Sequence, residues 1–292
     1  MKPIGIGYLQ IANSQFLTKL PPMKLNIYKS LWGMPGALEE QLRQIADAGY
    51  DGIEVPMPAP ENEARFRKLL RHYKLDYIPM AITTGENVDE HLRTLQAELK
   101  RAMTFKPSLI NVQGSKDYYW YDEQVHFFEQ ALALAQPMER AGVPVLHETH
   151  RTRALYAPNV TGRLLRLFPE LKLTSDLSHW CVVCESLLDD QQEDLALACA
   201  RTHHIHARVG YEGGAQVPDP RAPEWAAHVA KHEAWWKATL ATQKKARREV
   251  MTVTVEYGAH YYMHTLPYTQ QPVANVWDVN LWMAERARKW VK

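Results

Sequence analysis

Short apolar runs, rich in β-branched residues, recur along the chain at intervals of roughly thirty residues, and most are separated by helical patterns. Such regular alternation requires parallel strands, because a parallel pair needs a long crossover between its members. Eight βα units in about 270 residues predict a single (β/α)8 TIM barrel of the α/β class. We expect its strands at Leu25–Ser30, Gly52–Pro56, Asp76–Ile82, Ser108–Gln113, Val143–His147, Leu171–Ser175, Thr202–Ala207 and Met251–Tyr257.

The segment GALEEQLRQIADAG, at positions 36–49, illustrates the intervening helices. Its apolar residues Leu38, Leu42 and Ile45 recur at helical spacing, and Gly49 provides a stop. An open doubly wound sheet is the competing architecture. It is less favoured because YKSLWGMPG, which contains the end of the first strand, is not the G-x-G-x-x-G phosphate loop.

Two segments do not fit the repeat. Residues 1–23 precede the first strand and are interpreted as a short N-terminal arm, which leaves 24–292 as one catalytic barrel domain. Residues 208–226 form a Gly/Pro-rich loop after the seventh strand. Because loops at the carboxyl ends of barrel strands build active sites, this loop is a candidate lid.

The charge balance limits the classes of partner. Thirty-four basic and 33 acidic side chains give a net charge of +1, which favours neither nucleic acid nor an anionic membrane surface. The sequence has no run of 18 apolar residues and no signal-peptide pattern at its start, so we expect a cytoplasmic protein without a membrane span. It leaves a homo-oligomer open. The three cysteines do not form a disulfide framework, and the CVVC pair is interpreted as two buried thiols.

Polar side chains mark the carboxyl ends of the last four predicted strands. The fifth ends in VLHETH, the sixth in TSDLSH, the seventh in HHIHAR and the eighth in VTVEYG. Neighbouring barrel strands lie roughly 4.8 Å apart, so these ends converge on one small volume. The converging groups are Glu148, Asp176, His206 and Glu256.

Three carboxylates and an imidazole in one buried volume predict a divalent cation, which removes the repulsion between the anions. Oxygen-rich ligation favours Mn²⁺, with Mg²⁺, Co²⁺, Ni²⁺ or Zn²⁺ as alternatives, and no organic cofactor is expected. A cation beside a sugar carbonyl stabilises an enediolate, and a neighbouring carboxylate can remove the α-proton. Glu148 and Glu256, three strands apart in the ring, can approach a substrate from nearly opposite faces.

The order Glu, Asp-x-x-His, His, Glu on strands five to eight resembles the xylose-isomerase-like superfamily of sugar isomerases, epimerases and endonuclease IV relatives. The phrase AGYDGIEV at 48–55 resembles that superfamily's second strand. The resemblance implies that Glu148, Asp176, His206 and Glu256 hold one Mn²⁺ or Co²⁺, as in its ketose 3-epimerases. It further implies that the two glutamates are the acid and base, and that His179 contacts a carbohydrate substrate.

Further polar residues are expected around this core. His150 and Arg208 share the parity of Glu148 and His206, and Glu54 and Gln113 end strands two and four. We expect all four to bind substrate.

The sequence departs from two branches of the superfamily. Gln113 stands where a three-zinc endonuclease needs a ligand, so abasic-site cleavage is disfavoured. Ala154 stands where the epimerases carry an acidic substrate contact, which predicts a different hydroxyl pocket. Sugar isomerase or epimerase chemistry is favoured. A 3-keto-glycoside lyase or hydratase using the same ligands remains the alternative, and a non-catalytic sugar-binding barrel is a third reading.

Overall fold

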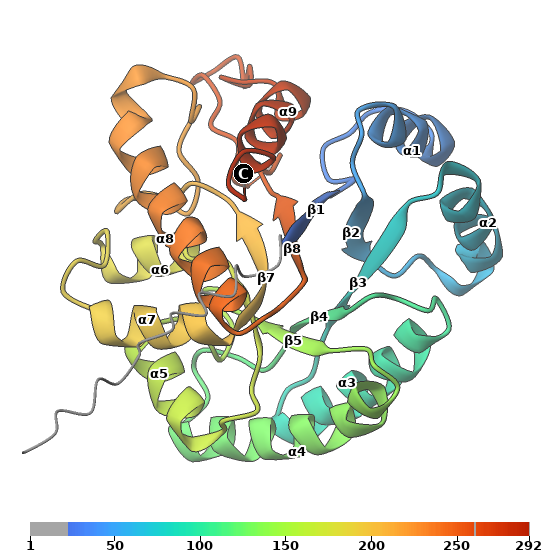
Figure 1. Ribbon diagram of the computed structural model, residues 1–292, viewed down its shortest axis with the longest axis vertical. Helices are drawn as coiled ribbons and strands as arrows, with labels where there is room; N and C mark the ends of the chain where they lie inside the picture. The colour runs from blue at the N-terminus through green and yellow to red at the C-terminus, as the bar shows by residue number, and fades with distance from the viewer. Residues whose placement is uncertain (1–22, 260, 292) are drawn as a thin grey trace, which may run out of the picture.

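The computed structural model describes residues 23–259 and 261–291, which form a closed barrel of eight parallel strands in the order of the chain. Figure 1 shows the strands at the centre with the helices around them. This confirms the predicted (β/α)8 fold. The strands are β1 (Lys24–Lys29), β2 (Gly52–Pro56), β3 (Asp76–Ile82), β4 (Ile110–Gln113), β5 (Val145–Glu148), β6 (Leu173–Ser175), β7 (Thr202–Ala207) and β8 (Val250–Val255).

The connections place a helix after each strand of the described chain. Two α-helices, α6 and α7, follow β6, and short 3-10 helices precede α2 and α8. The helices are α1 (Leu38–Asp47), η1 (Pro60–Asn62), α2 (Glu63–Tyr73), α3 (Val88–Met103), α4 (Tyr121–Arg140), α5 (Pro158–Leu167), α6 (Ser178–Cys184), α7 (Gln192–Arg201), η2 (Pro223–Trp225), α8 (Ala226–Lys245) and α9 (Val276–Ala287).

The sequence located β2, β3 and β7 to the residue, and it placed β4, β5 and β6 two residues too early at their starts. These three strands are short and begin after a turn, where an apolar run does not distinguish turn from strand. The arm predicted for residues 1–23 lies outside the described residues except for Met23, which is buried in the core.

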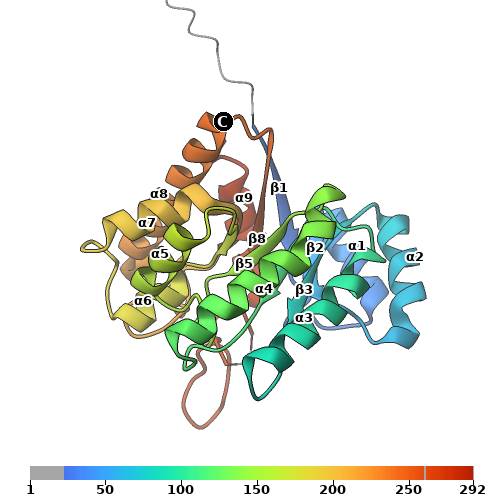
Figure 2. The ribbon, with the colours of Figure 1, turned by 90° about the horizontal axis from the view of Figure 1, so that it is seen from below.

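The loop between β8 and α9 is a second long connection that the strand pattern did not single out. Figure 2 shows it projecting beyond the end of the barrel at which the strands finish. It contains the exposed aromatic residue Tyr268 and also Tyr262, which returns to the barrel mouth. This loop therefore contributes to the same end of the barrel as the strand-end carboxylates.

The barrel interior is layered, as expected when alternate strands contribute to each level. Tyr28, Ile78 and Leu146, from β1, β3 and β5, form a small apolar cluster together with Leu109. Two residues farther along β5, the inward position is Glu148. Because side chains alternate along a strand, these two inward-facing positions of β5 are successive, and the layer above the apolar cluster is polar.

Lys29 is fully buried at 1% exposure, on the strand parity opposite to the inward-facing Tyr28. Its Nζ donates a hydrogen bond to the Ser30 carbonyl at 2.5 Å. Burial lowers the pKa of Lys29 from 10.5 to about 8, against the attraction of Glu256, which raises it. A charged lysine at this position therefore opposes folding below that pH.

We expect the contribution of Lys29 to stability of the metal-free protein to rise between about pH 8 and 10.5, because there the unfolded chain binds a proton that folded Lys29 does not. Burial raises the pKa values of Cys181 and Tyr28, which act in the opposite direction at high pH, so the contribution is measured as the difference between wild type and Lys29→Met. Lys29→Met should remove this contribution and stabilise the fold at pH 7 by up to about 3 kcal/mol. Urea unfolding of EDTA-treated protein at pH 7 and pH 10 measures both effects. Lys24→Met, on the exposed end of the same strand, is the control. Equal pH dependence in the wild type and Lys29→Met would contradict the account.

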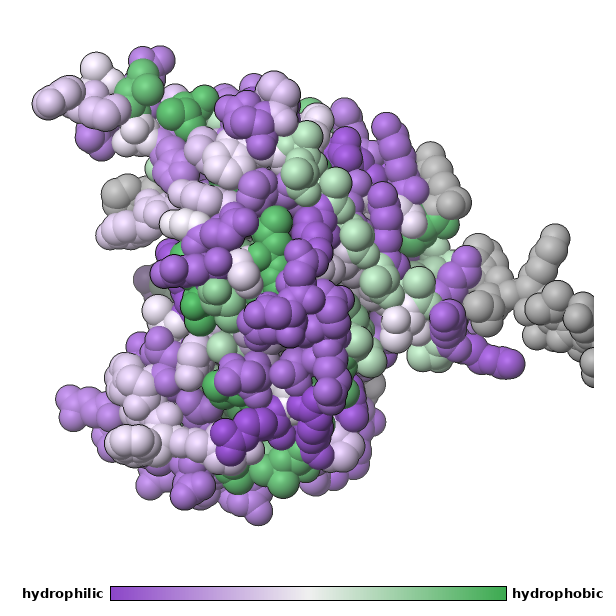
Figure 3. Space-filling view, turned by 90° about the vertical axis from the view of Figure 1, so that its left-hand side faces the viewer, coloured by the Kyte–Doolittle hydropathy of each residue, from purple (hydrophilic) through white to green (hydrophobic). Residues whose placement is uncertain are grey.

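The face in Figure 3 is mainly hydrophilic, with apolar side chains in small separate groups. Among the helices of the described residues, none is both long enough and apolar enough to cross a bilayer.

Candidate active site

Three of the four predicted metal ligands meet at the end of the barrel. The nearest ligand atoms of Glu148, Asp176 and His206 all lie within 4.8 Å of one another, and all three residues are buried. Glu256, which directly follows β8, adjoins this group through His206. The strand-end positions therefore converge as the sequence predicted.

His206 has two differently occupied ring nitrogens. Nε2 lies 3.0 Å from both carboxylate oxygens of Glu54. A carboxylate can only accept, so Nε2 carries a proton. Nδ1 faces the other way, 2.8 Å from Glu256 Oε2 and 3.5 Å from Glu148 Oε1. This is the arrangement in which a carboxylate orients an imidazole toward a metal ion.

The contact between His206 Nδ1 and Glu256 Oε2 lacks hydrogen-bond geometry. Both atoms are buried, and neither has a hydrogen-bond partner within the described residues. Two atoms that bind one cation at right angles, with bonds of about 2.1 Å, lie about 3 Å apart. Their 2.8 Å separation therefore fits a pair of ligands for one ion.

The remaining ligand atoms are held by hydrogen bonds. Glu148 Oε2 accepts from the side-chain amides of Asn111 at 3.0 Å and Gln113 at 2.9 Å. Asp176 Oδ1 accepts from the backbone N–H of Ser178 at 3.1 Å and from its hydroxyl at 2.5 Å. These bonds leave Glu148 Oε1 and Asp176 Oδ2 directed to other partners.

Arg208 bridges two of the carboxylates. Its Nε donates to Asp176 Oδ2 at 3.1 Å, and its Nη2 lies 2.6 Å from Glu256 Oε1. Arg208 is 3% exposed, so the guanidinium neutralises buried charge. The Tyr262 ring also contacts Arg208, with the guanidinium carbon 4.2 Å from the ring centroid, in a cation–π arrangement.

The pKa values of the ligand residues respond to this crowding. Burial raises the pKa of Asp176 to about 6, partly offset by Arg208. Burial also opposes ionisation of Glu148, but the His206 imidazole outweighs it and lowers the pKa of Glu148 to about 2. Burial works against a charged His206, yet the carboxylates of Glu54, Glu256 and Glu148 raise its pKa well above the ordinary range. The carboxylates of the cluster therefore strongly favour a positive charge between them.

These residues fit a divalent cation. The donors are three carboxylates and one imidazole, which binds metal in its neutral form. Two of the donor atoms, His206 Nδ1 and Glu256 Oε2, are buried without hydrogen bonds in the described chain. A cation would replace the proton that the carboxylates now favour on His206.

Two further histidines lie beside the cluster. His179 Nε2 is 3.4 Å from Asp176 Oδ2, and the His179 ring lies against that of His150 with centroids 3.9 Å apart. His150 Nε2 is 3.5 Å from the Tyr262 hydroxyl. His179 is fully buried, whereas His150 reaches the cavity above the cluster.

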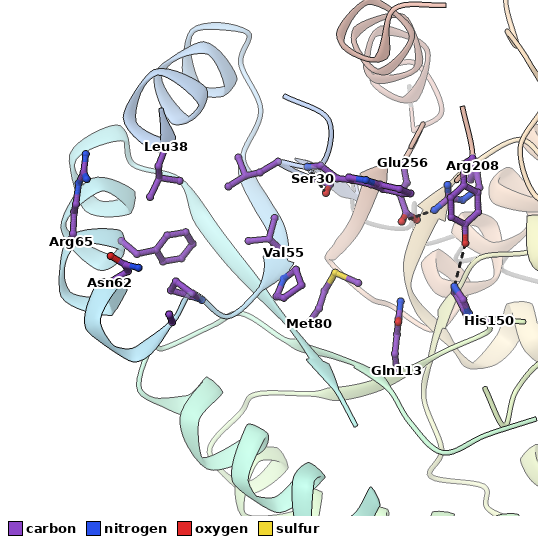
Figure 4. A pocket seen from close by; sticks show the side chains of 17 residues that line it. Ser30, Leu38, Val55, Asn62, Arg65, Met80, Gln113, His150, Arg208 and Glu256 are labelled. Atoms are coloured by element: carbon purple, nitrogen blue, oxygen red, sulfur yellow. Dashed lines mark hydrogen bonds and ion pairs between the residues drawn. The ribbon is translucent and has the colours of Figure 1, made fainter. Parts of the chain in front are cut away.

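That cavity has a volume of about 850 Å³. Figure 4 shows Gln113, His150, Arg208 and Glu256 together at one end. Glu148, Asp176, His206 and His179 do not line it and lie behind this group. Of the four proposed ligands, Glu256 is therefore the one that lines the cavity.

Glu54 does not lie where the sequence interpretation put it. We expected it to bind substrate, but it is 1% exposed and sits below His206, where His204 Nε2 lies 3.0 Å from it and Asn111 donates at 2.8 Å. Glu54 lies deeper in the barrel than expected because it comes two residues before Pro56, the last residue of β2. The sequence interpretation also missed Tyr262, because a residue in a long loop carries no strand periodicity.

A family model described as xylose isomerase-like TIM barrel matches residues 42–222. The chain belongs to this family, as its sequence motifs indicated. No match was found among curated proteins.

Solved structures share the fold at low sequence identity. A D-tagatose 3-epimerase-like protein has a TM-score of 0.62 at 12% identity, over 91% of this chain and 97% of that one. An AP endonuclease of family 2 from Brucella melitensis has 0.60 at 14%, over 91% and 99%. A 3-keto-D-glucoside 4-epimerase from E. coli has 0.55 at 13%, over 82% and 94%. Such distant likeness establishes the fold alone.

Proposed function

We propose that the protein is a divalent-metal-dependent isomerase or epimerase of a sugar or sugar derivative, and that the substrate passes through an enediolate. The observation that carries the proposal is the approach of two carboxylates, the buried Glu148 and the partly exposed Glu256, to Nδ1 of His206, which has no hydrogen-bond partner in the described chain. Membership of the xylose isomerase-like family supports the carbohydrate substrate class.

The metal would be held by Glu148, Asp176, His206 and Glu256, with Mn²⁺ favoured by the oxygen-rich set. When bound, it would stabilise negative charge that develops on the oxygen of a neighbouring carbonyl. Asp176 would serve as a ligand; Ser178 holds its carboxylate, and its backbone N–H donates to the Thr149 hydroxyl.

The two glutamates would move the proton. One carboxylate removes the proton from the carbon next to the carbonyl, and the other returns a proton to the opposite face for epimerisation. Their different partners suit different roles: the amides of Asn111 and Gln113 hold Glu148, whereas Arg208 holds Glu256. Isomerisation between adjacent carbons would need only one of them.

Substrate hydroxyl groups would be bound at the rim of the cluster. Arg208, His150 and Gln113 reach the cavity and offer donors there. His179 stands directly behind His150 and beside Asp176, so its contact with substrate would require the substrate to reach the buried cluster.

Glu54 is proposed as a positioning residue, because it contacts His206 only on the side away from the ligands. Glu54→Gln should lower the affinity for Mn²⁺ by about 10–100-fold, the usual effect of losing the carboxylate behind a metal-binding histidine. Titration calorimetry with Mn²⁺ measures this change. Glu61→Gln, on the exposed turn after the same strand, should leave the affinity unchanged. Wild-type affinity in a correctly folded Glu54→Gln variant would refute the role.

Proton NMR in D₂O tests the reaction class. Metal-loaded protein would be incubated with a panel of ketoses, sugar acids and 3-keto-glycosides. Deuterium should appear at a carbon next to a carbonyl, and EDTA should abolish the exchange. The position of the label and the product separate isomerase and epimerase activity from lyase activity. A panel without EDTA-sensitive exchange would count against the proposal.

A further inference from the structure

The cavity above the cluster has two chemically different ends. Figure 4 shows Gln113, His150, Arg208 and Glu256 at one end, Leu38, Asn62 and Arg65 at the other, and Val55 and Met80 between them. The whole space is continuous and measures about 850 Å³. Small-molecule sites span about 300–1,000 Å³, so this cavity lies near the upper end of that range. The four residues at the polar end form only part of its lining.

The second end and the adjoining Val55 side chain are here together called the apolar arm, whose apolar walls are Leu38, Val55, Pro58, Ala59 and Phe66. These residues come from the start of α1, the end of β2, the loop after it, and α2. Apolar side chains facing a cavity gain free energy when a ligand removes them from water. The arm offers no carboxylate and no imidazole to a sugar hydroxyl.

The arm is supported by a packed core. Phe66 is 2% exposed, and its ring meets those of Tyr77 and Phe105 edge-on, with centroids 5.1 and 6.1 Å away. Val55 belongs to a barrel strand and to the same buried cluster. Walls held in this way are preformed, so a ligand does not have to order them.

We propose that the substrate carries an apolar, ring-sized substituent, and that the arm binds this substituent while the sugar portion lies at the polar end. The inference rests on the proposed function for the sugar portion and goes beyond it by naming the substrate class, an aryl-substituted sugar derivative. Asn62 and Arg65 are exposed at the outer end of the arm, where they can donate hydrogen bonds to oxygen groups on the ring.

Matched glycosides test the arm without requiring turnover. The affinities of phenyl and methyl glycosides of D-glucose, D-galactose and D-xylose would be measured by titration calorimetry with the full-length, Mn²⁺-loaded protein. For at least one sugar, the phenyl glycoside should bind about tenfold more tightly than the methyl glycoside, equivalent to about 1.4 kcal/mol.

Ala59→Trp fills the arm from an exposed loop position and should abolish the phenyl preference. The matched control is Ala64→Trp, which adds the same indole at an exposed position of α2 that does not line the cavity. Circular dichroism establishes that both variants are folded. The control should keep the preference.

Absence of a phenyl preference for all three sugars, whether both glycosides bind equally or neither binds at millimolar concentration, would overturn the inference. So would a preference that survives in Ala59→Trp. Proton exchange, measured separately on the wild type, keeps the two proposals distinct. A phenyl preference without proton exchange would support the apolar arm as a binding site and reject the isomerase proposal. Proton exchange without a phenyl preference would support the isomerase proposal and reject the apolar arm as a binding site.

Discussion

Glu256→Gln should lower turnover by about 10²–10⁴-fold, the usual contribution of a positioned general acid or base. The substitution keeps the size of the side chain but removes the proton-accepting carboxylate that lies 2.8 Å from His206 and 2.6 Å from Arg208. The pKa of Glu256 is lowered because Arg208 and His206 outweigh its burial, so it is ionised at neutral pH, the form in which a carboxylate acts as a base. Steady-state kinetics with the substrate identified by proton exchange measures the loss.

The loss has to be separated from loss of the metal. Metal analysis of the same sample should find the ion still bound at saturating Mn²⁺, and Glu285→Gln, an exposed carboxylate on α9, is the matched control. For a two-base epimerase, Glu256→Gln should still exchange the proton of one epimer with solvent but not that of the other. Glu148→Gln should show the opposite preference. Full turnover in either variant would reject the acid/base assignment.

His206→Ala should lower the affinity for Mn²⁺ by more than about 100-fold, beyond what loss of a supporting carboxylate causes. The imidazole is the one nitrogen donor among the proposed ligands, and without it Glu54 loses a partner 3.0 Å from each of its oxygens. Activity should fall in parallel. Titration calorimetry with Mn²⁺ and activity at several metal concentrations measure the two effects.

A second buried imidazole provides the control for this variant. His147, on β5, has the opposite strand parity and packs against Phe128 of α4, with ring centroids 5.2 Å apart. His147→Gln should leave metal affinity unchanged even where it lowers stability. Wild-type affinity in His206→Ala would show that the metal binds elsewhere.

The sequence predicted the barrel and the convergence of its strand ends because both depend on local patterns. A strand has a period of two, so the inward parity of Glu148 and His206 could be read once their strands were located. Depth along the barrel axis was harder to predict. Glu54 and His206 are both inward-facing, but Glu54 lies one layer lower and became a support for the imidazole.

Contacts between distant segments could not be predicted in the same way. The bridge from Arg208 to Asp176 and Glu256 depends on a side-chain direction that strand parity does not specify. Tyr262 reaches Arg208 from a loop without periodicity. The apolar arm joins Leu38 to Phe66 from two different helices, so it emerges only when the helical shell has closed around the barrel.

The position of the metal tests the proposed site most directly. Crystals of Mn²⁺-loaded protein would be measured near the manganese absorption edge. We expect one anomalous peak at bonding distance, about 2.0–2.6 Å, from Glu148, Asp176, His206 and Glu256. A peak elsewhere, or no peak while Arg208 still bridges Asp176 and Glu256, would contradict the proposed site.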